Sequence, residues 1–422
     1  MKSSTARKLR QVPAGYLLVG VDPHKKKRGA AAMTQDAVVH TKFKFTNSRE
    51  GYEAALERVR ADMVKTGCRG VIFAIETGGH YWRNFAYYLE DKGVPFRLIS
   101  QFTLKRRRDG KDLSRRKNDF RDAEMAADLL RVGDFTETRL PQGVYAELRS
   151  AYSSYFRLVK ERTRITNLLK GLLDGLFPEF TQVFKDPCAQ TALAVLSLCP
   201  VPGAIARMTE DELMCAFKAA YPQQRLMRKK LLALHAVART SIGIRSGAAS
   251  VALEVSSVVE RLRLIRQQVG RVTELLGTLV DRTEEGKYLL SIRGVNYMSA
   301  AGLLAELGSL RAYRNAKQLV KMAGTNPIES ESGGKRASHT PMSKKGRSRL
   351  RYCAWTAVIP LLRHNPDFRA WAKRLRERPV QANPLNGKEV VGAVLNRLLR
   401  LAYALARKQT FYRLPQPAAI SS

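Results

Sequence analysis

The sequence has few of the residues that build secreted, zinc-binding or membrane-spanning proteins. Its five cysteines are odd in number, and no two of them have Cys-x-x-Cys spacing. This argues against a disulfide framework and against a zinc site, and we expect reduced thiols in a cytoplasmic protein. There is no run of about 18 apolar residues, so we expect no membrane span. The basic N-terminus has no apolar segment before Asp22, so we expect no secretory signal.

Acidic residues are also scarce. There are 37 of them against 74 Lys and Arg, which gives a formal net charge of +37 at pH 7. A surplus of this size repels itself unless a polyanion neutralises it, and nucleic acid is the natural partner. An anionic membrane surface is the weaker alternative. The basic residues are spread through the chain, so we expect a long polyanion that contacts several faces of a globular protein with two to four domains.

Against this basic background, two acids lie three residues apart at the start of a helical pattern. Asp119 and Asp122 precede the apolar-periodic run 123–130. On a helix, residues i and i+3 lie about 5–6 Å apart on one face. Two carboxylates that close repel each other unless a cation lies between them. The segment 105–117, with eight Lys or Arg, predicts a basic loop. The combination favours a metal site that handles a polyanion, and an acidic first helical turn is the alternative.

The segment before these acids has the pattern of a mixed α/β domain. Asp22 and Glu76 each end an apolar run that we interpret as a buried strand. Neighbouring parallel strands end at one edge of a sheet, and a lone buried acid there would be costly. A shared Mg²⁺, or Mn²⁺ in its place, would make the acids tolerable. The strands are expected at 16–22, 28–33, 38–45, 71–76 and 96–100, and the helices at 49–66 and 80–92.

Two long helical patterns follow. The first, 146–176, has two apolar sets with spacing four, three and four, and the register breaks between them. The second, 255–279, alternates three and four without a slip, as in a heptad seam. We expect an antiparallel coiled-coil stalk, within one chain or between two, with two amphipathic helices of a globular bundle as the alternative. Short helices are expected within 179–250. The segment 289–307 resembles a helix-hairpin-helix, in which a Gly turn offers backbone N–H groups to a phosphate.

The C-terminal part contains a serine-rich loop next to many cations. The sequence Glu331-Ser332-Gly333-Gly334 is followed by 335–351, which holds seven Lys or Arg and no acid. A serine flanked by cations can attack a phosphodiester if a base, a metal or a cationic site assists it. A plain linker is the alternative. Trp355, Trp371 and the helical pattern at 390–406 predict a further helical pack, and the tail after 413 is expected to be disordered.

Taken together, these residues resemble one family, the DEDD transposases of bacterial insertion sequences, now known as RNA-guided (bridge-RNA) recombinases. The strand and helix order is also that of the ribonuclease H and RuvC-like fold. The resemblance is carried by Val19-Gly20-Val21-Asp22, Glu76-Thr77-Gly78, Lys117-Asn118-Asp119 with Asp122-Ala123, Ser332-Gly333, and Met342-Ser343-Lys344-Lys345-Gly346 with Leu350-Arg351. One departure is Thr325-Asn326, where the family has an apolar residue.

The resemblance implies a split active site. A RuvC-like domain would contribute Asp22, Glu76, Asp119 and Asp122 with their Mg²⁺. A C-terminal domain would contribute a serine, Ser332 or alternatively Ser330, that becomes transiently linked to a DNA phosphate. It further implies a structured noncoding guide RNA that pairs with donor and target DNA, a homo-oligomer (dimer or tetramer) and a nucleoid-associated place in a bacterial cytoplasm. A DNA invertase, a RuvC-like hydrolytic junction nuclease and a noncatalytic nucleic-acid scaffold are the alternatives.

We therefore expect the fold class α/β plus α. The predicted parts are a RuvC-like domain at 1–145, a helical linker region at 146–285, a transposase domain at 286–412 and a tail at 413–422. The residues expected to contact nucleic acid are Lys105, Arg106, Arg107, Arg108, Arg115, Arg116, Lys335, Lys344, Lys345, Arg347, Arg349 and Arg351.

Overall fold

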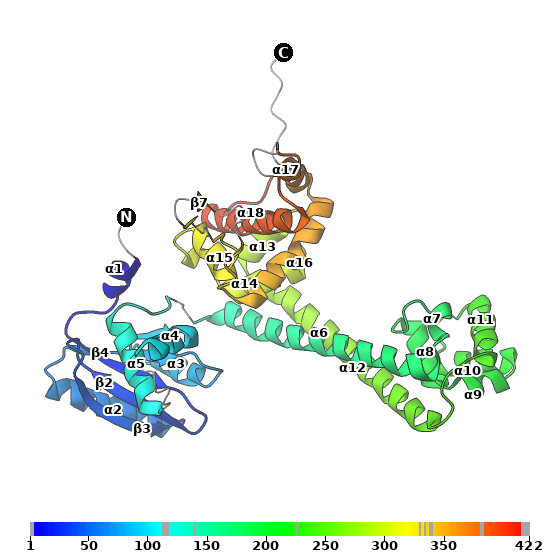
Figure 1. Ribbon diagram of the computed structural model, residues 1–422, viewed down its shortest axis with the longest axis horizontal. Helices are drawn as coiled ribbons and strands as arrows, with labels where there is room; N and C mark the ends of the chain where they lie inside the picture. The colour runs from blue at the N-terminus through cyan, green and yellow to red at the C-terminus, as the bar shows by residue number, and fades with distance from the viewer. Residues whose placement is uncertain are drawn as a thin grey trace, which may run out of the picture. The chain divides into compact units, whose positions relative to one another are not determined.

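The computed structural model of the chain describes residues 4–111, 118–137, 140–224, 226–328, 331–332, 335–336, 341–379 and 384–414. The chain divides into two compact units, an N-terminal unit of residues 1–140 and a C-terminal unit of residues 141–422. The first is a mixed α/β unit, and the second is almost entirely helical (Figure 1).

A five-stranded sheet forms the centre of the N-terminal unit, in the order β3-β2-β1-β4-β5. The strands are β1 Tyr16–Asp22, β2 Lys27–Met33, β3 Val39–Thr46, β4 Gly70–Glu76 and β5 Phe96–Ile99. Strands β1, β2 and β3 are antiparallel neighbours, whereas β1, β4 and β5 are parallel neighbours. All the strands predicted from the sequence are therefore confirmed. Because β1 and β4 run parallel in the middle of the sheet, their last residues lie at the same edge.

Helices cover both faces of this sheet, because the side chains of β1 alternate between two cores. Leu17, Val19 and Val21 pack with the helices α2, Arg49–Lys65, and α3, Trp82–Asp91. Leu18 packs on the opposite face with α4, Gln101–Lys111, and α5, Asp119–Arg131. A short helix, α1 Ser4–Leu9, precedes the sheet. The central strands are consequently buried on both faces, as their continuous apolar sequences predict.

The prediction of a basic loop at 105–117 is wrong for its first part, which belongs to α4. Lys and Arg are good helix formers, and Leu104 anchors the helix in the core with no exposed surface. Two arginines of α4 find carboxylate partners on α5, a tertiary contact that the local sequence does not reveal. Residues 112–117 lie outside the described part of the chain.

A glycine in β1 allows α5 to lie directly on the sheet. A Cβ atom at Gly20 would stand 1.8 Å from the carbonyl oxygen of Ala123, so no other residue fits there without moving the helix. The contacting face of α5 is built from small residues, including Ala123, Ala126 and Ala127, all without exposed surface. Asn118 caps the helix by accepting a hydrogen bond from the N–H of Phe120 at 3.1 Å. The first turn of α5 is thereby fixed beside the end of β1.

The C-terminal unit is organised by two long helices, α6 Gly143–Leu176 and α12 Ala248–Asp281, of 34 residues each. They pack side by side (Figure 1). The start of α6 shares a hydrophobic core with the end of α12, and the end of α6 shares a second core with the start of α12. The two helices are therefore antiparallel and belong to one chain. The predicted end of the first helix at Phe177-Pro178 is confirmed.

Each end of this helix pair carries a separate helical core. The first, the distal core, contains α7 Phe180–Val183, α8 Gln190–Leu198, α9 Pro202–Arg207, α10 Glu210–Ala220 and α11 Arg228–Arg239. The second, the proximal core, contains α13 Glu284–Leu290, α14 Tyr297–Leu307, η1 Leu310–Ala312, α15 Ala316–Ala323, α16 Ser348–His364, α17 Pro366–Arg376 and α18 Gly387–Lys408.

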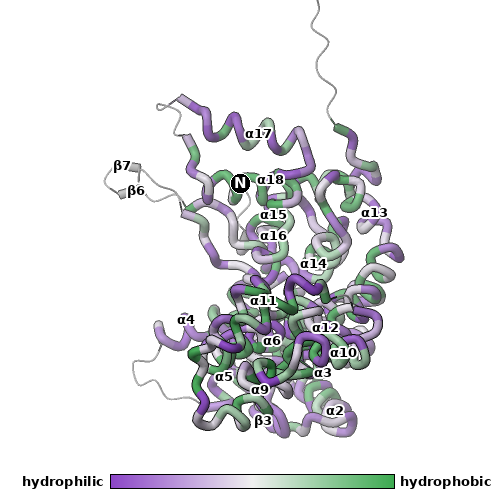
Figure 2. Tube along the Cα trace, turned by 90° about the vertical axis from the view of Figure 1, so that its right-hand side faces the viewer, coloured by the Kyte–Doolittle hydropathy of each residue, from purple (hydrophilic) through white to green (hydrophobic). Residues whose placement is uncertain are grey.

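The C-terminal unit contains the predicted Gly turn and further helices near the C-terminus. The turn between α13 and α14 contains Gly294 at φ +99°, a backbone conformation that favours glycine, so the predicted pair of helices around a Gly turn is present. In Figure 2, α17 is coloured mostly as hydrophilic, and its buried residues are Phe368, Ala372 and Leu375.

Throughout the chain the five cysteines are free thiols. Within the described residues, no helix has the length and apolar content needed to cross a membrane.

Candidate active site

Three of the four predicted acids meet at the carboxyl edge of the sheet. Asp22 is the last residue of β1, Glu76 is the last residue of β4, and Asp122 lies in the first turn of α5. One carboxylate oxygen from each lies within 4.8 Å of the others. The exposed fractions of the three residues are 6%, 8% and 2%. Residues 100 positions apart in the sequence thus form one buried acidic cluster.

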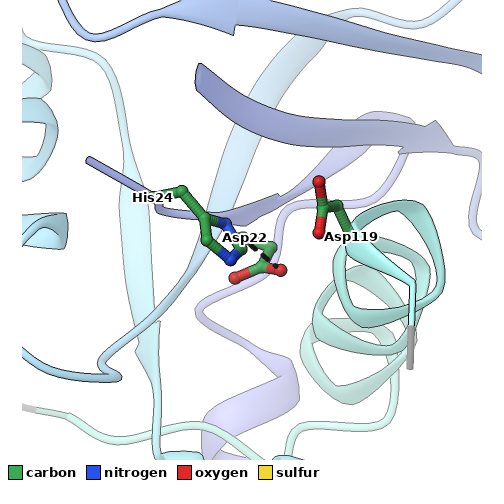
Figure 3. Close-up of side chains that lie close together, drawn as sticks. All are labelled: Asp22, His24 and Asp119. Carbon is green, nitrogen blue, oxygen red and sulfur yellow. Dashed lines mark ion pairs between the residues drawn. The ribbon is translucent and has the colours of Figure 1, made fainter. Parts of the chain in front are cut away.

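The fourth predicted acid, Asp119, is not in this cluster but also lies close to Asp22. It forms a second group with Asp22 and His24, and their ligand atoms also lie within 4.8 Å of one another (Figure 3). Lys44 of β3 forms an ion pair with Asp119 at 3.1 Å. The hydrogen bond from Lys44 lowers the pKa of the Asp119 carboxyl. Asp22 is therefore common to both groups.

His24 is a member of this group that the sequence did not predict. The segment after β1 was interpreted only as a turn, yet the Nδ1 atom of His24 lies 3.7 Å from Oδ2 of Asp22. Its side chain is 47% exposed. The available signal was a histidine two residues after a strand-end acid, in a chain that has only six histidines.

The acidic cluster carries more negative charge than its buried setting favours. Burial, together with the neighbouring charges of Asp22 and Asp122, raises the pKa of Glu76 to about 7, although Arg108 opposes the shift. In the absence of another cation, Glu76 therefore keeps a proton near neutral pH. Arg108 of α4 supplies one positive charge, because its Nη2 and Nε atoms donate to Oδ1 of Asp122 at 2.5 and 3.1 Å. Hard carboxylate oxygens without a thiol are the donor set that Mg²⁺ and Mn²⁺ prefer, so these residues fit such an ion.

The basic residues of α4 divide into two kinds. Arg107 donates to Asp128 at 2.6 Å, as Arg108 does to Asp122, so both guanidinium groups bind acids of α5. Lys105 and Arg106 are exposed and remain candidates for contact with nucleic acid. Arg115 and Arg116 lie outside the described residues.

The predicted serine lies on a short two-stranded element of the C-terminal unit. Strands β6, Glu331–Ser332, and β7, Lys335–Arg336, are antiparallel, and Ser332 pairs with Lys335 across the element. This register places the backbone of the candidate nucleophile opposite a basic residue. The alternative serine, Ser330, lies outside the described part of the chain.

The structure accounts for the polar pair Thr325-Asn326, where the resemblance leads one to expect an apolar residue. The hydroxyl of the buried Thr325 donates to Oδ1 of Asn396 at 2.5 Å, and the Asn396 amide donates back to the Thr325 carbonyl at 3.1 Å. The hydroxyl of Ser343 donates to Oδ1 of Asn326 at 2.7 Å. Thr325 thus ties the start of the serine-containing segment to α18, and Asn326 joins that start to the end of the segment at Ser343.

The basic residues after the serine also divide into two kinds. Lys344 and Lys345 are exposed. Arg349 forms an ion pair with the buried Glu306 at 2.6 Å, and Arg351 donates to the Ala323 carbonyl at 2.8 Å. Arg347 donates to the Glu306 carbonyl. The three arginines thus hold α16 against α14 and α15, while the two lysines are open to a polyanion.

Comparison with known proteins finds two transposase profiles, one that matches the acids and one that matches the segment with the serine. A DEDD-type IS110 transposase profile matches residues 19–178, which include all four acids. A profile described as "Transposase IS116/IS110/IS902 family" matches residues 286–373, which include Ser332. The chain is 24% identical over 370 residues to the "Mini-circle putative transposase for IS117" of Streptomyces coelicolor, covering 85% of this chain and 87% of that protein. It is 26% identical over 357 residues to the "Transposase for insertion sequence element IS1111A" of Coxiella burnetii, covering 83% of this chain and 80% of that protein.

A third relative, the "Insertion element IS900 uncharacterized 42 kDa protein" of Mycobacterium paratuberculosis, is 24% identical over 308 residues, which cover 70% of this chain and 73% of that protein. Both profiles and the first two relatives are described as transposases. The chain belongs to the DEDD-type transposases of insertion sequences and is an enzyme of transposition.

Proposed function

We propose that this transposase cuts and rejoins DNA by two transesterification steps that use an acidic Mg²⁺ site and the hydroxyl of Ser332. The observation that carries the proposal is the convergence of Asp22, Glu76 and Asp122 at one edge of the sheet, with Asp119 in a second group that shares Asp22. Three buried carboxylates at that distance are costly in a fold unless a cation compensates them. A metal ion that serves in phosphoryl transfer would compensate the charge of these three carboxylates.

The residues of the cluster have distinct parts in this proposal. Asp22, Glu76 and Asp122 would hold Mg²⁺, or Mn²⁺, which supplies positive charge to the transferring phosphoryl group. Lys44 keeps Asp119 ionised through their ion pair. Arg108 forms an ion pair with Asp122, so a bound ion would share that carboxylate with the guanidinium group.

The proposed reaction of the serine needs no external energy source, because each step exchanges one phosphate ester bond for another. The Ser332 oxygen attacks a DNA phosphorus atom, a serine–phosphorus ester bond forms, and the bond from phosphorus to one deoxyribose oxygen breaks. The serine gives up its hydroxyl proton, and the departing deoxyribose oxygen gains one. In the second step, the hydroxyl of another DNA end attacks the same phosphorus and releases the serine. One ester bond replaces another in each step, so strands can be exchanged and rejoined.

The same proposal includes the partners implied by the resemblance. Donor and target DNA would be chosen by pairing with a structured noncoding RNA, while the protein grips the nucleic-acid backbone. The active protein would be a dimer or tetramer in which the acids and the serine come from different protomers. The region 146–285 would link the catalytic parts 1–145 and 286–412. The net charge of +37 supports a large nucleic-acid partner.

The proposal is tested by isolating DNA that is covalently attached to the full-length protein after denaturation. We expect an adduct from the wild type and from Ser330→Ala, and none from Ser332→Ala. Binding of Mn²⁺, followed by electron paramagnetic resonance, should be unchanged in Ser332→Ala and weakened in Asp22→Asn. An adduct that survives in Ser332→Ala but not in Ser330→Ala would move the nucleophile to Ser330. Sequencing the RNA that copurifies with the protein tests the guide.

A hydrolytic junction nuclease is the second candidate, because the acidic cluster is complete within the N-terminal unit. Such an enzyme would cut DNA through the acids alone. Undiminished cleavage by Ser332→Ala, without any adduct in the wild type, would favour it. A noncatalytic scaffold would keep its function in Asp119→Asn, whereas either enzyme would lose activity.

A further inference from the structure

A cavity in the C-terminal unit has no part in the serine and metal chemistry proposed above. Its volume is about 180 Å³. Three segments far apart in the sequence form it: the middle of α6, the start of α14 after the Gly294 turn, and the middle of α16. Its walls are Tyr152, Tyr155, Phe156, Val159, Asn296, Met298, Ser299, Tyr352 and Thr356.

The cavity lies where the apolar seam of α6 changes register. Tyr152 belongs to the proximal core, and Ile165 belongs to the distal core. Between them, Tyr155, Phe156 and Val159 are only half-buried. The opposite seam of α12 shows the same change, because Val269 and Val272 are half-buried while the seam residues on either side are buried. The cavity therefore lies beside the proximal core, along the part of α6 where burial decreases.

The walls of the cavity are aromatic to an unusual degree for a place that solvent can reach. The rings of Phe156 and Tyr352 meet edge to face with centroids 5.4 Å apart, and those of Tyr152 and Tyr155 lie 5.6 Å apart. Tyr352 is 47% exposed although it lies in a helix with a buried face. An exposed aromatic ring beside an open cavity offers a planar surface to a planar ligand.

The charge around the cavity is positive. The ammonium group of Lys160 lies 4.7 Å from the ring centre of Phe156, and Arg157 is exposed one residue after that ring. Glu161, the acid in this stretch of α6, is neutralised by Arg164 at 2.6 Å and by Arg261 at 3.3 Å. A ligand attached to a phosphate chain would therefore be attracted to the mouth of the cavity.

Polar groups line one side of the cavity. Asn296 caps α14 by accepting from the N–H of Ser299 at 2.9 Å, so a ligand would meet its amide NH₂ group. Thr356 is exposed on α16, and because its hydroxyl donates to the Cys353 carbonyl at 2.9 Å, it can offer a ligand only an acceptor. Stacking surfaces, cations and a few hydrogen-bonding groups are the features with which proteins hold the bases of single strands. The volume is below the roughly 300 Å³ at which sites for drug-sized ligands begin, so it suits one ring system.

From these observations we propose that the cavity binds a single unstacked base of single-stranded DNA. The proposal rests on the protein acting on DNA and is independent of the metal and of Ser332. Such a strand arises whenever one strand of a duplex is displaced, and holding one of its bases would keep the strand from reannealing. The occupant is DNA because the family acts in transposition. Binding of RNA alone is an outcome of the test.

The test uses the full-length protein and a short single-stranded DNA oligonucleotide that carries one fluorescent purine analogue, whose emission falls when it stacks on an aromatic ring. We expect quenching with the wild type. Tyr352→Leu and Phe156→Leu should abolish the quenching and weaken binding about tenfold at fixed salt. Tyr352→Phe should retain both. The salt dependence of binding should be unchanged, because no phosphate contact is lost.

The matched control is Phe411→Leu, which removes another exposed aromatic ring of the same unit, 58% exposed and paired with Tyr288 rather than with the cavity. It should bind as the wild type does. Thr356→Leu keeps every ring but adds bulk at the rim, and it should also abolish quenching. This second route keeps the test valid if an aromatic variant fails to fold, which circular dichroism would show.

Equal binding and quenching by the wild type, Tyr352→Leu and Thr356→Leu would overturn the proposal, as would an equal loss in Phe411→Leu. The same measurement with an RNA oligonucleotide of the same sequence separates the two sources of bases. Quenching with RNA and none with DNA would overturn the assignment to DNA. Loss of the covalent adduct in Ser332→Ala with normal quenching would leave this proposal standing, so the two failures are distinguishable.

Discussion

Replacing Glu76 by Gln should make the metal-free protein more stable above neutral pH. The reason is the shifted pKa of Glu76, about 7 in the folded protein compared with 4.5 for an ordinary glutamate. Between these values the folded protein keeps a proton that the unfolded chain has released, so the free energy of unfolding falls as pH rises. At 1.36 kcal/mol per pKa unit, the loss above pH 7 is about 3 kcal/mol. Gln carries no charge at any pH and avoids this loss.

The measurement is urea denaturation of the wild type and of Glu76→Gln, in EDTA, across the range from pH 4.5 to pH 8. We expect the two unfolding free energies to be similar at the acid end and to separate by about 3 kcal/mol in favour of the variant at the alkaline end. Titrating groups far from the cluster contribute equally to both proteins, so the difference reports on Glu76 together with the acids that interact with it, Asp22 and Asp122. Adding Mg²⁺ at the alkaline end should stabilise the wild type more than the variant, because the variant has lost one carboxylate ligand.

Parallel stability curves for the two proteins would refute this reasoning. They would mean that Glu76 ionises in the fold at an ordinary pKa, and that Asp22 and Asp122 do not raise this pKa. The proposed metal site would then lose the electrostatic part of its support, although the short distances between the carboxylates would remain.

Three other measurements follow from the structure. Gly20→Ala should destabilise the protein by at least about 1–3 kcal/mol in urea, because the new Cβ meets the backbone of α5, whereas Gly171→Ala, with no atom within 4 Å of its Cβ, should stabilise α6 by up to about 1 kcal/mol. Arg108→Gln should lower stability by about 2 kcal/mol in EDTA and increase the stabilisation by added Mg²⁺, whereas Arg106→Gln at an exposed site should change neither. The logarithm of DNA affinity should fall linearly with the logarithm of salt concentration, and Lys344→Gln should reduce that slope by about one; a flat salt response would contradict a phosphate-dominated interface.

The sequence was sufficient for the elements whose own pattern marks them. The strands of the sheet were predicted because continuous apolar runs of strand length end at turn residues, and the two long helices because their apolar residues recur every three or four positions. Asp22 and Glu76 could be placed at one edge because both end such runs and the strands were expected to be parallel. The acids of α5 could be placed because they lie three residues apart, between a basic segment and an apolar-periodic helical run.

Features that depend on tertiary partners were not predictable in this way. The first part of 105–117 was predicted as a loop and not as helix α4, because the ion pairs of its arginines with acids of α5 cannot be inferred from the local sequence. His24 was missed because its role depends on the approach of Asp119 from a distant helix. The register break in α6 was visible in the sequence, but its meaning, a change from one core to another, required the packing of α12.

The antiparallel pair of α6 and α12 has a consequence for how such proteins can change over evolution. Each helix is about 50 Å long at 1.5 Å per residue. The five helices α7–α11 connect the end of α6 to the start of α12, and they share one hydrophobic core with those two helix ends. An insert that replaced them would have to cover the apolar residues of α6 and α12 that they bury, such as Ile165 and Val258. We therefore expect relatives to tolerate changes in this arm only where those apolar side chains stay covered.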